Sequence, residues 1–249
     1  MSTSSTKKAA AKKPEILRHY TNIESLYKIL DSGYLLLNDP EKKWDDKNDV
    51  AAVRAFRRLK GNGTEARTVC FLDGEESIYH WKTFAKDEGC CISFSKNEIL
   101  KLIKGTKFLH GTVKYKREIK AEELNKLIPK NIKKIPFIKR NQYKCENEYR
   151  IIWPEIGKVP NIHFKREAIK NVTLSPEIPD IDRQKIKKLL KEKYGIKAQF
   201  SRVLELPKWI RIFENLGKRN SKKHKTQQSE KSSNRENRGS DKKKERVKQ

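Results

Sequence analysis

Residues 146–153 read Glu-Asn-Glu-Tyr-Arg-Ile-Ile-Trp and have the composition of a β-strand. Successive side chains of a strand point to opposite faces, so Glu146, Glu148 and Arg150 are expected on one face. The aromatic and aliphatic residues between them would anchor the other face in a core. Two carboxylates and a guanidinium on one face can stabilise a developing positive charge, or they can form charge pairs on an exposed surface. Both interpretations stay open at this point.

A second acidic pair, Asp45 and Asp46, lies in a polar loop. Together with Glu146 and Glu148, these aspartates could hold Mg²⁺ in a metal-dependent nuclease. A turn followed by a helix N-cap explains the same two residues without any metal. The turn with its N-cap is the favoured interpretation.

Strand-like and helix-like segments that surround these residues must position them. Strands are expected at residues 15–20, 34–38, 68–72, 90–94, 108–115, 146–153, 169–174 and 198–204. A helix is expected from the capping box Thr21–Glu24 to Gly33, and further helices near 53–59, 78–85, 96–104, 121–128 and 181–194. Strands mixed with helices of these lengths indicate the α+β class.

The formal net charge is +27 at pH 7, of which +9 lies in residues 217–249, +4 in residues 1–14 and +14 in the rest of the chain. A polyanion is the expected partner, and RNA or DNA is favoured over a membrane surface. A helix that binds a membrane surface would combine basic residues with a continuous apolar face, and we expect no such segment in this sequence. A Lys-rich, solubilising surface without a specific partner remains the alternative.

Both ends of the chain have too few apolar residues to offset the entropy lost on ordering. Residues 1–14 and 217–249 are therefore expected to be disordered, the latter as a Lys/Arg-rich tail. Residues 15–216 are expected to form a single α+β domain.

The four cysteines show no spacing typical of a metal site, so we expect no metal and interpret them as buried thiols in a reducing compartment. The sequence has no apolar run of about 18 residues and no signal-peptide-like segment. These features predict a soluble, cytoplasmic protein. The oligomeric state is left open.

Short motifs along residues 15–206 resemble, in order and spacing, a widespread bacterial and phage family of unknown function. Its members typically begin with His-Tyr-Thr and end their core with Tyr-Glu-x-Glu-x-Arg. The matching motifs are Arg18-His19-Tyr20-Thr21, Ser32-Gly33, Asn38-Asp39-Pro40, Trp44-Asp45-Asp46, Trp81 with Phe84-Ala85, Cys91-Ile-Ser-Phe94 and Glu146-x-Glu148-x-Arg150.

That family in turn resembles the diphtheria-toxin and poly-ADP-ribose polymerase branch of ADP-ribosyltransferases. The resemblance implies split small β-sheets with flanking helices around a cleft for NAD, which would be a substrate. It implies that Glu148 stabilises the positive charge on the ribose during bond cleavage and that Glu146 positions the acceptor or assists electrostatically. The residues that it implies in NAD binding are Arg18, His19, Tyr20, Thr21, Trp81 and Arg150.

Each assignment has a structural alternative. His19 could be a satisfied structural histidine, Trp81 could be a core residue at helical spacing, and Arg150 could simply neutralise a neighbouring glutamate. The sequence departs from the family at Phe84, where a tyrosine is usual. Tyr79 is an imperfect substitute because it lies on another face of the same helix.

The function implied is an NAD-consuming, ADP-ribosyltransferase-like enzyme, for example a toxin or phage-defence effector acting on nucleic acid or a nucleic-acid-associated target. One alternative is a nucleic-acid-binding protein without catalysis, which would use its basic surface and tail. The second is the metal-dependent nuclease described above.

Overall fold

The computed structural model describes residues 15–61, 63–86, 88–204 and 206–216. The described residues up to Ser201 form one compact unit, and those from Arg202 onward form a second. The predicted disordered segments 1–14 and 217–249 lie outside the described residues. The domain limits 15–216 remain a prediction.

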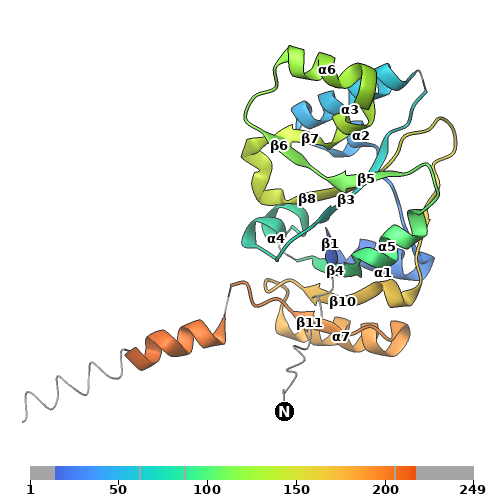
Figure 1. The fold of residues 1–249 in the computed structure, drawn as a ribbon. Helices are drawn as coiled ribbons and strands as arrows, with labels where there is room; N and C mark the ends of the chain where they lie inside the picture. The colour runs from blue at the N-terminus through green and yellow to red at the C-terminus, as the bar shows by residue number, and fades with distance from the viewer. Residues whose placement is uncertain (1–14, 62, 87, 205, 217–249) are drawn as a thin grey trace, which may run out of the picture. The chain divides into compact units, whose positions relative to one another are not determined.

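Seven strands of the first unit form the main sheet in the order β11-β10-β4-β1-β3-β8-β5 (Figure 1). Their bounds are Ile16–Thr21 (β1), Arg67–Leu72 (β3), Cys90–Ser95 (β4), Leu109–Thr112 (β5), Glu148–Trp153 (β8), Ile169–Leu174 (β10) and Ala198–Phe200 (β11). Two small sheets pair β2 (Tyr34–Leu35) with β9 (Ile162–His163) and β6 (Lys114–Lys116) with β7 (Ile138–Arg140). With its helices, this arrangement confirms the predicted α+β class.

The main sheet is weakly joined between β1 and β3. These two strands share one register pair, Arg18 with Leu72. By contrast, β1 pairs with β4, and β3 pairs with β8, over six positions each. The sheet therefore consists of two well-paired sections that meet at the β1/β3 seam, which agrees with the expected split sheets.

The helices of the first unit are α1 (Ile23–Ser32), α2 (Pro40–Lys43), α3 (Lys47–Lys60), α4 (Ile78–Phe84), α5 (Lys96–Ile103), α6 (Ala121–Asn131) and α7 (Asp180–Tyr194). Three short 3₁₀ helices are η1 (Ile132–Phe137), η2 (Asn141–Glu146) and η3 (Arg166–Ala168). The start of α1 differs from the prediction. Its N-cap is Asn22, whose side chain accepts a hydrogen bond from the Ser25 amide, so the expected Thr21 capping box is wrong. Gly33 ends the helix in the left-handed conformation, as predicted.

Two apolar clusters bury opposite faces of β8. Ile151 belongs to the larger cluster, which also contains Leu26 of α1 and Ile99 of α5. Ile152 belongs to a smaller cluster with Phe56 of α3. Because strand side chains alternate, Glu148 and Arg150 lie on the Ile152 face, toward α3.

Several local predictions need correction. The strands expected at 34–38 and 198–204 are shorter, and the one expected at 108–115 is divided into β5 and β6. Cys90 and Cys91 are buried, but Cys70 is half-buried and Cys145 is exposed.

Residues 207–216, orange in Figure 1, form a helix that we did not expect from the sequence. Within the described part of the chain, no helix is long and apolar enough to span a membrane.

Candidate functional site

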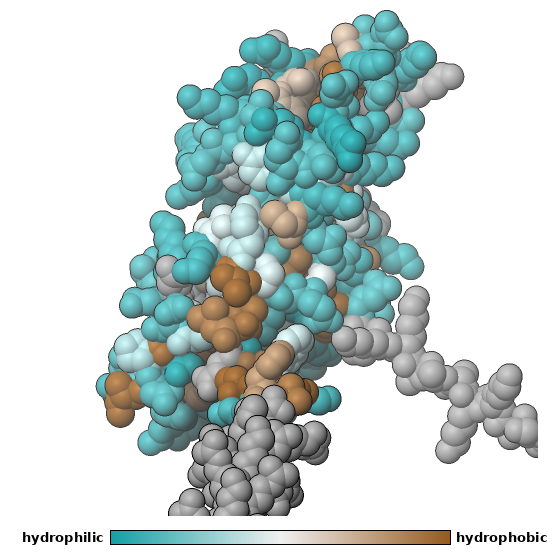
Figure 2. Space-filling view, turned by 90° about the vertical axis from the view of Figure 1, so that its left-hand side faces the viewer, coloured by the Kyte–Doolittle hydropathy of each residue, from teal (hydrophilic) through white to brown (hydrophobic). Residues whose placement is uncertain are grey.

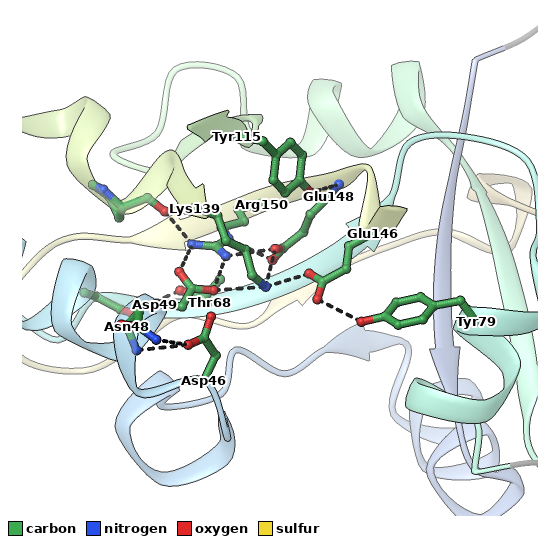
Figure 3. Close-up of polar contacts among 12 residues, drawn as sticks. Asp46, Asn48, Asp49, Thr68, Tyr79, Tyr115, Lys139, Glu146, Glu148 and Arg150 are labelled. Atoms are coloured by element: carbon green, nitrogen blue, oxygen red, sulfur yellow. Dashed lines mark hydrogen bonds and ion pairs between the residues drawn. The ribbon is translucent and has the colours of Figure 1, made fainter. Parts of the chain in front are cut away.

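Glu148 and Arg150 form a tight, two-bond ion pair at the start of β8 (Figure 3). The guanidinium donates from Nε to Glu148 Oε1 at 2.7 Å and from Nη2 to Oε2 at 2.8 Å. Arg150 is completely buried and Glu148 is 6% exposed. Two parallel charge-assisted bonds fix both the position and the orientation of the carboxylate.

Arg150 also contacts elements far away in the sequence. Its Nη1 donates to Asp49 Oδ1 at 2.9 Å and to the Pro136 carbonyl at 2.7 Å. Its guanidinium lies 4.5 Å from the centre of the Trp44 ring. These contacts join α3 and η1 to the face of β8 that carries Glu148 and Arg150.

Lys139 of β7 lies among three carboxylates. Its Nζ is 2.6 Å from Glu146 Oε2, 3.2 Å from Asp49 Oδ2 and 3.4 Å from Glu148 Oε2. Asp49, Lys139, Glu146, Glu148 and Arg150 together are called the ion-pair cluster below. With three acids and two bases, its formal charge is −1.

Backbone geometry, rather than strand alternation, brings Glu146 into the cluster. β8 begins at Glu148, so the prediction that Glu146 lies on the same strand is wrong. Glu146 ends η2, and Asn147 then adopts a left-handed conformation with φ of 40°. This turn directs the Glu146 carboxylate to the same ammonium that Glu148 contacts.

The two glutamates differ in their pKa values. Burial alone would raise the pKa of Glu148, but Arg150 and then Lys139 outweigh burial and hold it at about 2. Burial also raises the pKa of Glu146, and there Lys139 offsets the effect only in part. Glu148 is therefore ionised at neutral pH, while Glu146 ionises less readily.

Tyr79 and Tyr115 complete the surroundings of the glutamates. The Tyr79 hydroxyl donates to Glu146 Oε1 over a long 3.3 Å, and its pKa is raised to about 12 by burial and by Glu146. The Tyr115 hydroxyl accepts from the Glu148 amide at 2.8 Å. Tyr79, which the sequence offered as an imperfect substitute for a tyrosine at position 84, thus contacts Glu146.

The same helix, α4, leaves Ile78 and Phe84 exposed. Figure 2 shows hydrophobic residues gathered within a mostly hydrophilic face at the height of α4.

The structure does not bring His19 into direct contact with the cluster. Arg18 is paired with Leu72 across the sheet, and Leu72 is paired with Glu148, so the Arg18 side chain lies on the same face of the sheet as Glu148. The side chain of the next residue, His19, lies on the opposite face. His19 instead lies at the β1/β3 seam, where its Nδ1 is 3.0 Å from the Cys70 carbonyl oxygen.

Cys70 links His19 to the cluster, because its thiol lies beside the Glu148 carboxylate. Burial lowers the pKa of His19, so the ring is neutral at pH 7. Among the described residues, no protein group partners its Nε2.

Apart from Arg150 of β8, the other predicted NAD-binding residues lie along β1 and α4. The Tyr20 ring stacks on His80 at 5.4 Å and meets the edge of Trp81 at 5.1 Å. Trp81 is 2% exposed, and its Nε1 donates to Glu76 at 3.1 Å. Both aromatic rings are thus core residues in this structure, which was the structural alternative for Trp81.

Arg18 and Thr21 flank these rings on β1. Arg18 donates to the Gly74 carbonyl and pairs with Glu75 at 3.3 Å. Thr21 pairs with Cys90 at the end of β1.

The proposed metal ligands do not assemble. Asp46 caps α3 by accepting a hydrogen bond from the Asn48 amide at 3.0 Å, which confirms the turn and N-cap interpretation. Lys139 and Arg150 lie between the carboxylates that a nuclease would need to share a cation. Within the described ranges, no group of three or more His, Cys, Asp or Glu side chains is placed to hold a metal.

Two cavities lie on either side of α5 and away from the cluster. One, of about 490 Å³, is lined by Ser95, Asn97, Glu98, Leu100, Lys101, Lys104 and His110. The other, of about 520 Å³, is mostly apolar and includes Phe108 and Trp153. Neither is lined by Glu146, Glu148 or His19.

Sequence reasoning missed Asp49 and Lys139. Asp49 did leave a signal, because it precedes Val53 by four residues and so lies on the buried face of α3. Lys139 left none, since it is one of many lysines in a basic, irregular segment.

Comparisons with known proteins give a partial family match and distant structural neighbours. Residues 80–151 match the model of a family described as a protein of unknown function, DUF2971. Thermus sp. 2.9 DarT in complex with ADP-ribosylated ssDNA has a TM-score of 0.40 at 12% identity, over 79% of this chain and 98% of that chain. The same protein in complex with NAD+ has a TM-score of 0.40 at 12% identity, over 78% and 98%.

DarT in complex with carba-NAD+ has a TM-score of 0.39 at 15% identity, over 78% and 98% of the two chains. No curated protein matches the chain. The family model agrees with the resemblance to a family of unknown function that the sequence motifs indicate. At these TM-scores the likeness shows neither an activity nor a ligand for this chain.

Proposed function

We propose that this protein is an NAD-consuming, ADP-ribosyltransferase-like enzyme whose site comprises the ion-pair cluster and the adjoining β1/β3 seam. The observation that carries the proposal is the pair of buried glutamates, with Glu148 ionised and held by Arg150. A fixed negative charge in a water-poor site is what the cleavage of a nicotinamide–ribose bond requires. NAD is the proposed substrate.

In the proposed reaction the C–N bond between ribose and nicotinamide breaks, and its electron pair leaves with the nicotinamide nitrogen. The ribose carbon acquires oxocarbenium-like positive charge, as in glycoside hydrolysis. A nucleophile from the acceptor, or water, then bonds to that carbon and loses its proton. A carboxylate near the ribose 2-hydroxyl stabilises the positive charge while the bond opens.

The hydrogen bonds that the two glutamate carboxylates already accept suggest different roles for them. Glu148 already accepts two bonds from Arg150 and contacts Lys139 and the Cys70 thiol, so its acceptor capacity is largely used. Glu146 Oε1 has one long bond, from Tyr79. We therefore assign the fixed charge near the ribose to Glu148 and the contact with the ribose or acceptor hydroxyl to Glu146.

The remaining proposed roles belong to residues at or near the β1/β3 seam. His19 would donate or accept through Nε2 at a ribose hydroxyl or the nicotinamide amide, and Arg18 on the Glu148 face would meet the pyrophosphate. Tyr20, Thr21 and Trp81 would shape the pocket from β1 and α4. Arg150 would act by orienting Glu148, since its own donors are used within the protein.

Nucleic acid, RNA or DNA, is the proposed acceptor or target because residues 15–216 and the tail are both basic. A role as a toxin or phage-defence effector is consistent with this chemistry and is part of the proposal.

The test is release of nicotinamide from NAD by the full-length protein, with and without RNA or single-stranded DNA. Glu148→Gln and Glu146→Gln should each lower the rate on the order of 100-fold to 1000-fold. Glu24→Gln is the matched control, because the ion pair of Glu24 among the described residues is with exposed Lys28. If folded Glu148→Gln and Glu146→Gln proteins kept the full rate, or the wild type released no nicotinamide under any of these conditions, the proposal would be wrong.

The burial of the ion-pair cluster favours one second candidate, a nucleic-acid-binding protein without catalysis. All five side chains are at most 9% exposed and mutually paired, as a purely structural network would be. Such a protein should bind RNA or DNA roughly 1000-fold more weakly at 200 mM than at 50 mM salt and release no nicotinamide.

A further inference from the structure

The helix at residues 207–216 exposes nearly all of its apolar side chains. Six large apolar residues in and next to it are 41% to 61% exposed: Leu206, Trp209, Ile210, Ile212, Phe213 and Leu216. Trp209 and Phe213, one turn apart, stack on each other with ring centres 5.7 Å apart. Side chains of this kind are rarely left in water without a partner.

These apolar residues lie along one side of the helix. At about 100° per residue, the six fall within an arc of roughly 160°. Lys208, Arg211, Glu214 and Asn215 lie on the opposite side. The helix is therefore amphipathic, with a continuous apolar face, and the expectation that no such segment exists is wrong.

The sequence that contains and follows this helix is strongly basic. Between residues 206 and 225 the only acidic residue in the sequence is Glu214. The basic residues in the same stretch are Lys208, Arg211, Lys218, Arg219, Lys222, Lys223 and Lys225. Two copies of such a segment would repel each other, so a second copy of this chain is a poor partner for the face.

We propose that helix 207–216 binds an anionic lipid surface and lies in the plane of the membrane interface. An interfacial helix presents Trp, Phe and Leu to the acyl boundary and carries basic residues that meet lipid headgroups. Trp209 and Phe213 supply the aromatic contact, and the flanking lysines and arginines supply the attraction. Nucleic acid would use the basic residues but leave the apolar face unexplained.

The proposal is independent of the proposed catalytic function, because binding alone tests it. The full-length protein is sedimented with vesicles of equal parts phosphatidylglycerol and phosphatidylcholine, or of phosphatidylcholine alone. The wild type should bind the anionic vesicles on the order of tenfold or more tightly than the neutral ones, and added salt should weaken this binding. Trp fluorescence should shift to the blue on binding.

Phe213→Glu places a charge in the apolar face, and Asn215→Glu places the same charge on the polar side of the same helix. Phe213→Glu should weaken binding on the order of tenfold relative to Asn215→Glu. Equal binding by the two variants would mean that the basic tail acts alone, and it would overturn the proposal.

Three further results would overturn the proposal by identifying another occupant for the apolar face. The first is a lower thermal stability of Phe213→Glu than of Asn215→Glu, which would mean that the face packs against the chain itself. The second is a wild-type dimer that Phe213→Glu dissociates, which would mean a second copy. The third is weaker binding of Phe213→Glu than of Asn215→Glu to double-stranded DNA without any effect on vesicles.

Discussion

Asp49 and Arg150, 101 residues apart in the sequence, are joined by two hydrogen bonds beneath the main sheet. The pair ties the first turn of α3 to the centre of β8, and Arg150 simultaneously holds Glu148. A buried ion pair contributes little net stability compared with apolar residues of the same shape, but breaking one leaves an uncompensated buried charge. Arg150 should therefore be costly to remove.

Arg150→Met leaves Asp49 and Glu148 without their principal cation. We expect a loss of about 3–5 kcal/mol in the free energy of unfolding, measured by urea denaturation. The control is Arg54→Met, because Arg54 pairs with Glu41 at the surface, where such pairs contribute about 0–1 kcal/mol. Similar losses for the two variants would contradict the structural role of the cluster.

Lys139→Met removes the ammonium that opposes the effect of burial on Glu146. The pKa of Glu146, already raised, should rise further. A group whose pKa is raised on folding contributes stability below its unfolded pKa and loses it as the pH rises through the folded pKa. The stability of Lys139→Met should therefore fall, relative to wild type, as the pH rises above about 4.3.

Carboxyl ¹³C NMR of Glu146 measures the shift in pKa directly. Lys101→Met is the control, since exposed Lys101 pairs with Glu98 and, among the described residues, with no other acid. An unchanged Glu146 titration in Lys139→Met would show that the short Lys139–Glu146 contact is absent in solution.

His19 should make the protein less stable in mild acid. Its pKa is lowered by burial, so its contribution to stability is complete above pH 6.5 and is lost as the pH falls through the folded pKa. His19→Gln cannot take up this proton, so its melting temperature should fall less than that of wild type between pH 7 and pH 5. The control is the same substitution at His163, an exposed histidine of β9.

Gly89 lies where β4 begins and cannot accept a side chain without movement. A Cβ there would lie 2.5 Å from the Ala85 carbonyl oxygen and still closer to that of Thr21. Gly89→Ala should destabilise the protein by about 1–3 kcal/mol in thermal or urea unfolding. At Gly111 of β5 the nearest atoms are 3.9 Å away, in the Phe137 ring, so Gly111→Ala should be tolerated.

The sequence predicted elements whose signals are local. The Gly33 helix end and the Asp46 cap each follow from one or two residues, and each was found where expected. The partnership of Glu148 with Arg150 also follows from their spacing on one strand face.

Other features depend on contacts that spacing does not encode. Lys139 contacts Glu146 and Glu148 from β7, which lies outside the main sheet and pairs with β6. The left-handed Asn147 that redirects Glu146 gave no sign in an otherwise strand-like run. His19 is the clearest example. Whether its side chain lies on the same face of the sheet as Glu148 depends on the register of β1, β3 and β8, which the spacing of residues in the sequence does not encode.

The single register pair between β1 and β3 makes the middle of the main sheet its most easily opened part. Sheets ordinarily fray from their outer strands inward, where fewest backbone bonds hold a strand. Here separation at the centre would break few such bonds, while the ladders on both sides stay whole. Amide exchange should accordingly be faster on the facing edges of these two inner strands than on the edges they turn toward β4 and β8.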